Sequence, residues 1–84
     1  MEREALKREL KALIVAECMK DLAPESLDDA EPLMGPQARL ELDSLDALQI
    51  SLAVQQRFGK RIEGTNEARH ALASVDALAD FILG

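Results

Sequence analysis

The chain has 84 residues, with 10 Lys plus Arg against 16 Asp plus Glu and a formal net charge of −6. A domain of this size buries about 60 to 65% of the surface of its unfolded chain, which leaves little room for an enclosed active site and argues against an enzyme. The negative charge repels nucleic-acid backbones, and two Phe without Trp or Tyr offer almost no base-stacking surface, so nucleic-acid binding is disfavoured. The acidic balance points instead to basic protein partners.

Cysteine usage and hydropathy set expectations about the compartment. A single Cys cannot form an intramolecular disulfide, and the N-terminus shows no signal-peptide pattern. No apolar run approaches the roughly 18 residues of a membrane span. We therefore expect a soluble, monomeric, cytoplasmic protein without a membrane span.

Residues 2–20 lack Gly and Pro and are rich in strong helix formers, which predicts a first helix over this range. Its apolar residues recur at spacings of three and four and form one stripe, which consists of Leu6, Leu10, Leu13, Ile14 and Cys18. Cys18 has no His near it in the sequence and no second Cys for a metal site. We interpret it as a small buried hydrophobic residue and not as a nucleophile.

The next segment, residues 21–43, is acidic and rich in proline. Residues 21–44 hold seven Asp and Glu against Arg39 alone, so the whole excess of acid lies there. Pro24, Pro32 and Pro36 favour a long connecting loop with a short turn inside it. Such a charge run is either a solvated loop or a docking surface, and the sequence leaves both interpretations open.

A second helix is predicted over residues 44–58. Asp43 is a good N-cap residue with Asp46 three positions later, and Gly59 suits the left-handed residue that ends a helix. This helix has two apolar stripes about 150° apart, one with Ala47, Ile50, Val54 and Phe58, the other with Leu45, Leu48 and Leu52. We assign the Phe58 stripe to the core and expect the three leucines to be exposed for a partner. The alternative is a central helix with both stripes buried.

The rest of the chain predicts a loop over residues 60–65, a short helix over 66–71 with Thr65 or Asn66 as its cap, and a last helix over 75–83 capped by Ser74. In the last helix Asp76 suits the first turn, and Val75, Leu78, Ala79 and Ile82 form the apolar stripe. No alternating pattern typical of a strand is present. The fold class is therefore all-α.

The polar residues could in principle form a hydrolase site, a metal site or a site of covalent modification. A hydrolase built on Ser44 and His70 lacks the G-x-S-x-G elbow, and His70 reads as a surface residue. One His, one Cys and scattered carboxylates give no metal-ligand spacing. Covalent modification of Ser44 remains, because a phosphodiester there would lie beside the free N–H groups and the positive dipole end of the helix.

At this point the residues resemble a known family. Residues 42–46, Leu-Asp-Ser-Leu-Asp, followed by the apolar register through Phe58 and Gly59, are similar to the attachment-serine motif and second helix of acyl carrier proteins. The likeness extends over the whole chain, including a last helix that opens with Ser-Val-Asp-Ala-Leu at residues 74–78. It implies a four-helix bundle in one domain, residues 1–84, with three longer helices, one short third helix and a long loop between helices 1 and 2.

The resemblance also implies a function. Ser44 would carry a 4′-phosphopantetheine arm, transferred from coenzyme A by a phosphopantetheinyl transferase, and the arm would hold acyl groups as thioesters. An acyl-loading enzyme, a ketosynthase and other enzymes of fatty-acid or polyketide-like biosynthesis would then dock on the serine helix. The residues that match this partner surface are Asp43, Leu45, Asp46, Leu48, Gln49 and Leu52.

The chain departs from the family pattern at several positions. Glu41 stands where many members have Gly, and Arg39 replaces a frequent acidic residue. Positions that are often Glu are here Gln49, Gln55, Gln56 and Arg57, which favours a specialised pathway such as a polyketide-like or aryl polyene cluster. Two other functions stay open: a peptidyl or aryl carrier of non-ribosomal synthesis, and a small acidic helical adaptor that binds a partner through Leu45, Leu48 and Leu52 without a prosthetic group.

Overall fold

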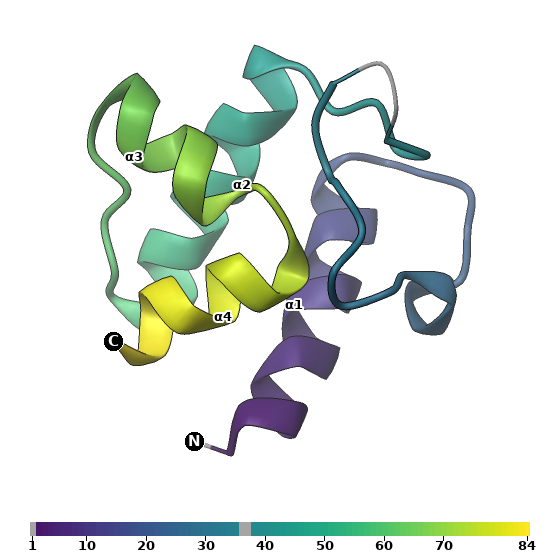
Figure 1. Ribbon diagram of the computed structural model, residues 1–84, viewed down its shortest axis with the longest axis horizontal. Coiled ribbons are helices and arrows are strands. Elements are labelled where there is room, and N and C mark those ends of the chain that lie inside the picture. The colour runs from purple at the N-terminus through teal and green to yellow at the C-terminus, as the bar shows by residue number, and fades with distance from the viewer. Residues whose placement is uncertain (1, 36–37) are drawn as a thin grey trace.

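The computed structural model describes residues 2–35 and 38–84, except the side chain of Thr65. Within these ranges the chain forms four α-helices, α1 Arg3–Glu17, α2 Ser44–Phe58, α3 Gly64–Ala71 and α4 Val75–Leu83, with a 3-10 turn at Pro24–Ser26 (Figure 1). No strand occurs in the described ranges, and Met34 and Leu42 form one isolated bridge. The all-α prediction is confirmed.

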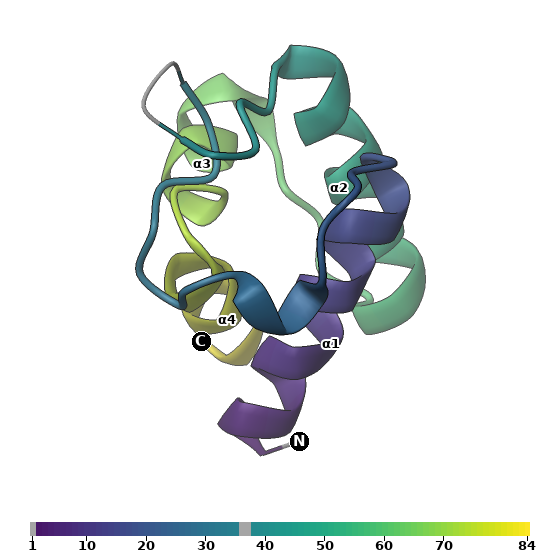
Figure 2. The same ribbon diagram turned by 90° about the vertical axis from the view of Figure 1, so that its right-hand side faces the viewer.

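Helix α1 is the element against which α2, α4 and the 3-10 turn pack. It contacts α2, α4 and the 3-10 turn, while α3 packs on α4 (Figures 1 and 2). Its predicted apolar stripe is buried at Leu6, Leu10, Leu13 and Ile14, and Cys18 is half-buried at the stripe's end. With a radius of gyration of 11.3 Å, close to the roughly 12 Å expected for a compact chain of this length, these helices enclose one core.

The helix α1 ends earlier than the predicted residue 20. Met19 adopts a left-handed conformation with a φ of 54°. Its N–H donates to the Ala16 carbonyl at 3.3 Å, and the Lys20 N–H donates to the Val15 carbonyl at 3.1 Å. This is the Schellman arrangement, which normally has Gly at the left-handed position. Because this position is Met19 and not Gly, nothing in the sequence indicates that the helix ends here.

The acidic segment between α1 and α2 is a long loop with the predicted short turn, but it is not simply solvated. It buries four leucines in the core, Leu27, Leu33, Leu40 and Leu42. Asp28 is exposed, as a solvated loop requires, whereas Asp29 and Glu31 are half-buried. Pro36, the third of the prolines used in the prediction, lies outside the described residues.

The second half of the chain follows the predicted boundaries with one correction. Helices α2 and α4 begin and end at the predicted residues, with Ser74 Oγ accepting the Ala77 N–H at 3.1 Å as the cap of α4. Helix α3 begins at Gly64 and not at residue 66, because Gly64 takes a φ of 83° at the turn and Glu67 Oε1 accepts the Glu63 N–H at 2.8 Å. Asn66 therefore lies inside the helix, and the Thr65 side chain lies outside what the structure describes.

Candidate functional site

Ser44 is the first residue of α2 and is exposed. The turn that holds it is closed by a reciprocal capping box, in which Asp43 Oδ1 accepts the Asp46 N–H at 3.0 Å and Asp46 Oδ2 accepts the Asp43 N–H at 3.2 Å. The backbone N–H of Asp46 thereby lowers the pKa of Asp43. At the other end Gly59 is left-handed and its N–H donates to the Gln55 carbonyl at 3.0 Å. Both predicted ends of this helix are confirmed.

The residues before Ser44 are anchored on both sides. The Leu42 N–H donates to the Leu33 carbonyl at 3.2 Å, and the Leu33 N–H donates to the Ala73 carbonyl at 3.2 Å, which ties the loop to the turn between α3 and α4. Glu41, between the buried Leu40 and Leu42, is exposed and left-handed with a φ of 48°. The backbone that leads into Ser44 is therefore tied by hydrogen bonds to the loop and to the turn between α3 and α4.

The two apolar stripes of α2 have separate environments. Ala47, Ile50 and Val54 are buried and Phe58 packs partly against the same core. Leu45, Leu48 and Leu52 are 62%, 54% and 52% exposed, and Gln49 beside them is exposed too. The predicted assignment is confirmed, and the alternative with both stripes buried is wrong.

An open groove lies beside Ser44, between α2, α3 and the loop that precedes α2. Its volume is about 730 Å³, and most of its lining is apolar, with Arg69 as the charged side chain among the residues that line it. Ser51 contributes a hydroxyl that donates to the Ala47 carbonyl at 2.8 Å. The apolar lining residues include Pro32, Met34, Leu48, Ile62, Ala68 and Ala73.

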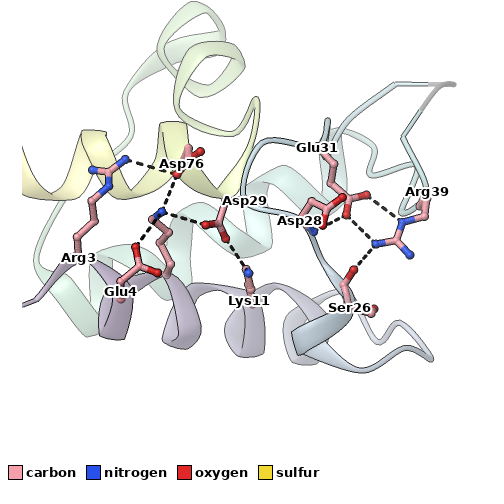
Figure 3. Close-up of polar contacts among 10 residues, drawn as sticks. Arg3, Glu4, Lys11, Ser26, Asp28, Asp29, Glu31, Arg39 and Asp76 are labelled. Carbon is pink, nitrogen blue, oxygen red and sulfur yellow. Dashed lines mark hydrogen bonds and ion pairs between the residues drawn. The ribbon is translucent and has the colours of Figure 1, made fainter.

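Part of the acid is neutralised by the protein's own cations, far from Ser44 in the sequence. Lys7 Nζ lies 2.9 Å from Asp29 Oδ2, 3.0 Å from Asp76 Oδ1 and 3.2 Å from Glu4 Oε2 (Figure 3). Lys11 adds a second bond to Asp29 at 2.7 Å, and hydrogen bonds from Lys11 and Lys7 lower the pKa of Asp29. The hydrogen bond with Asp29 is also the main cause that raises the pKa of Lys7. This network joins α1, the loop and α4.

A second ion pair fixes the loop itself. Arg39 donates to both carboxylate oxygens of Glu31, at 2.7 and 3.0 Å, and to the Ser26 carbonyl at 2.6 Å (Figure 3). The Arg39 hydrogen bonds lower the pKa of Glu31. The sequence predicted Arg39 as the only cation that balances the acidic segment. In the structure, Lys7 and Lys11 of α1 also form ion pairs with this segment, at Asp29.

The carboxylates near Ser44 differ from these paired ones. In residues 2–35 and 38–84, no ion pair forms with five acidic residues that lie at the end of α1 or around the start of α2, namely Glu17, Asp21, Glu41, Asp43 and Asp46. Glu41, Asp43 and Asp46 thus leave negative charge within three residues of Ser44 that no cation of the described residues pairs with.

No protein-family model and no curated protein matches the chain. No helix in the described part of the chain is long and apolar enough to cross a membrane.

Of the remaining reactive side chains, His70 is exposed as predicted, whereas Cys18, predicted to be buried, is only half-buried. His70 is exposed on the last turn of α3. Burial, followed by the negative charge of Asp46, raises the pKa of Cys18 to about 11, so its thiol is protonated at neutral pH. Neither residue forms part of the groove beside Ser44.

Sequence reasoning missed two features of this region. It did not predict the groove, because the lining comes from three segments whose packing no local pattern specifies. It also missed Met19, which is 90% exposed at the left-handed end of α1. Neither Gly nor Asn follows the last apolar residue of α1. This is a weak indication that another residue, less suited to a left-handed conformation, ends the helix.

Proposed function

We propose that the protein is a stand-alone, non-catalytic acyl carrier protein whose Ser44 carries a covalent 4′-phosphopantetheine arm. The observation that carries the proposal is the position of Ser44. It is exposed at the start of a capped helix, with an open apolar groove beside it and three exposed leucines following it along α2. A hydroxyl in this position is accessible to a modifying enzyme and needs no activation by the protein itself.

The backbone at Glu41 supports the resemblance on which this proposal rests. Many acyl carrier proteins have Gly at the matching position, and Glu41 adopts a φ of 48°, where glycine is preferred. Glu41 therefore has the left-handed backbone that the Gly of acyl carrier proteins would favour, although the residue itself differs. This agreement concerns a torsion angle at a position that is counted from Ser44, so it adds to the residue pattern of the serine motif.

The residues around Ser44 fit the proposed arm. Its phosphodiester would lie next to the first turn of α2, where the helix dipole favours negative charge. The groove offers the arm and its cargo an apolar surface, with Arg69 and Ser51 as polar contacts. When bound, the arm supplies the thiol that holds an acyl group as a thioester; the protein supplies its position and its surroundings.

The partner surface consists of Leu45, Leu48 and Leu52 with Gln49 and the acidic Asp43 and Asp46. A phosphopantetheinyl transferase, an acyl-loading enzyme and a ketosynthase would each cover the apolar leucines and meet the carboxylates with basic side chains. The neutral Gln49, Gln55 and Gln56 favour a specialised pathway, of the polyketide-like or aryl polyene kind, over the general fatty-acid synthase.

Intact-protein mass spectrometry tests the proposal. After incubation with coenzyme A and a phosphopantetheinyl transferase, the protein should gain the mass of one phosphopantetheine unit. Ser44→Ala should gain nothing, whereas Ser51→Ala, a serine of the same helix that also lines the groove, should gain the full unit. An unchanged mass of the parent protein, or the same gain in Ser44→Ala, refutes the proposal.

The exposed leucines also suit a second function, that of an acidic helical adaptor without a prosthetic group. Ser44→Ala separates the two, because an adaptor keeps its activity and a carrier loses it. A peptidyl or aryl carrier of non-ribosomal synthesis would bear the same arm. The mass of the species loaded in the protein's own cells distinguishes that function, since the cargo would be aminoacyl or aryl.

A further inference from the structure

Two residues of the described chain share an uncommon backbone state. Among the residues other than glycine in the described ranges, Met19 and Glu41 have positive φ, at 54° and 48°. A side chain in this region crowds the following carbonyl, so Gly would occupy both positions at lower cost. Strain that persists at two specific sites calls for a reason outside local stability.

Neither side chain contributes to the fold. The Met19 side chain is 90% exposed, and Glu41 is exposed and forms no ion pair with any described residue. The usual hydrophobic contact of a Schellman end is absent as well, because the residue after Met19 is Lys20. Neither side chain is thus buried or ion-paired with a described residue in a way that would offset the strained backbone.

Both residues lie at the end of the molecule that holds Ser44. Figures 1 and 2 show the C-terminal end of α1 in the upper half of the molecule together with the first turns of α2. The charges of Asp43 and Asp46 reach Cys18, the residue before Met19, and raise its pKa after the larger effect of burial. Glu41 lies three residues before Ser44. The end of α1 and the loop residue Glu41 thus both lie near the start of α2.

We propose that Met19 and Glu41 extend the partner surface of α2, and that this surface fits an enzyme with an apolar site rimmed by Lys and Arg. The inference rests on the proposed carrier function and adds two contact residues to it. Met19 supplies a flexible apolar contact of the kind that adapts to several partners. Glu41 belongs to the carboxylates that lack an ion pair with the described residues, and a basic rim would complement this set.

The experiment measures stability and partner use on the same variants. The parent protein, Met19→Gly and Glu41→Gly are compared in urea unfolding and in the kcat/KM of arm transfer by a phosphopantetheinyl transferase. Each glycine variant should raise the urea midpoint, because the strain is relieved, and should lower kcat/KM by about fivefold or more through KM, which corresponds to about 1 kcal/mol of lost contact. A residue with only a structural role would not change the two quantities in opposite directions.

Matched variants separate strain from contact. Met19→Ala and Glu41→Gln keep the strained backbone and remove the contact, so they should lower kcat/KM without raising the midpoint. Leu83→Ala removes another exposed apolar side chain, 46% exposed at the end of α4, and should leave kcat/KM unchanged. Glu41→Gln should also weaken the dependence of KM on salt concentration.

The outcomes distinguish this inference from the proposed function. If the parent gains the arm and both glycine variants keep kcat/KM within about twofold of the parent, the inference is overturned and the carrier function stands. If the parent gains no mass, the carrier function fails, and the inference fails with it.

Discussion

Substitutions in the two apolar stripes of α2 should lower the free energy of unfolding by different amounts. Ile50 is fully buried, so Ile50→Ala should lower the free energy of unfolding by about 2 to 5 kcal/mol. Leu48 is 54% exposed, and full burial of a leucine is worth about 1.5 to 3 kcal/mol. Leu48→Glu removes less than half of that and exchanges two good helix formers, so the loss should stay below about 1.4 kcal/mol.

These energies are measurable in a domain of this size. One kcal/mol corresponds to a shift of about 4 to 8 °C in Tm, so Ile50→Ala should lower Tm by about 8 °C or more, and by more than Leu48→Glu does. Thermal unfolding followed by circular dichroism gives both values. The kcat/KM of arm transfer should show the reverse order, with Leu48→Glu losing about tenfold.

Leu48→Gln is the control for charge, since Leu48→Glu also adds to the net charge of −6. The neutral variant should reproduce most of the loss in kcat/KM. A Tm loss in Leu48→Glu as large as that in Ile50→Ala would refute the reasoning, because Leu48 would then be part of the core. Unchanged arm transfer in both Leu48 variants would refute the partner surface.

The ion-pair network gives two further predictions. Folding lowers the pKa of Asp29 and Glu31, so their contribution to stability is complete above the unfolded-state pKa near 4 and is lost as pH falls through the lower folded-state pKa. The urea midpoint should therefore fall as pH drops below about 4, and Asp29→Asn should flatten this dependence. An equally steep fall in the variant would exclude Asp29 as its source. Lys7→Gln should speed hydrogen exchange of the Asp76 N–H, which donates to the Asp29 carbonyl at 2.9 Å, while Val54 in α2 keeps its protection. Equal exchange of the Asp76 N–H in parent and variant would show that Lys7 does not hold the loop to α4.

The helices and the serine turn were predictable because each depends on local chemistry. Asp43 and Asp46 cap α2 through contacts three residues apart, and Gly59 ends it through its own backbone freedom. The exposed stripe followed from geometry, since a helix against one core has no use for two apolar faces. What these features share is a short range along the chain.

The long loop could not be predicted in the same way. Its partners lie far away in sequence: Asp29 meets Lys7 and Lys11, and the Leu33 N–H meets the Ala73 carbonyl. Lys7 gave a partial signal, because it lies next to the apolar stripe of α1, where a charged side chain must find partners. The end of α1 and the start of α3 differ from the predicted residues, because Met19 and Gly64 have backbone torsions that the sequence pattern did not reveal.

The half-buried thiol at the end of α1 has a consequence for the carrier function that we propose. A thioester passes to another thiol only when that thiol is ionised, and the raised pKa of Cys18 keeps it protonated. Cys18 is the one cysteine of the chain. In the carrier function that we propose, Cys18 would therefore be a poor acceptor for an acyl group held on the arm.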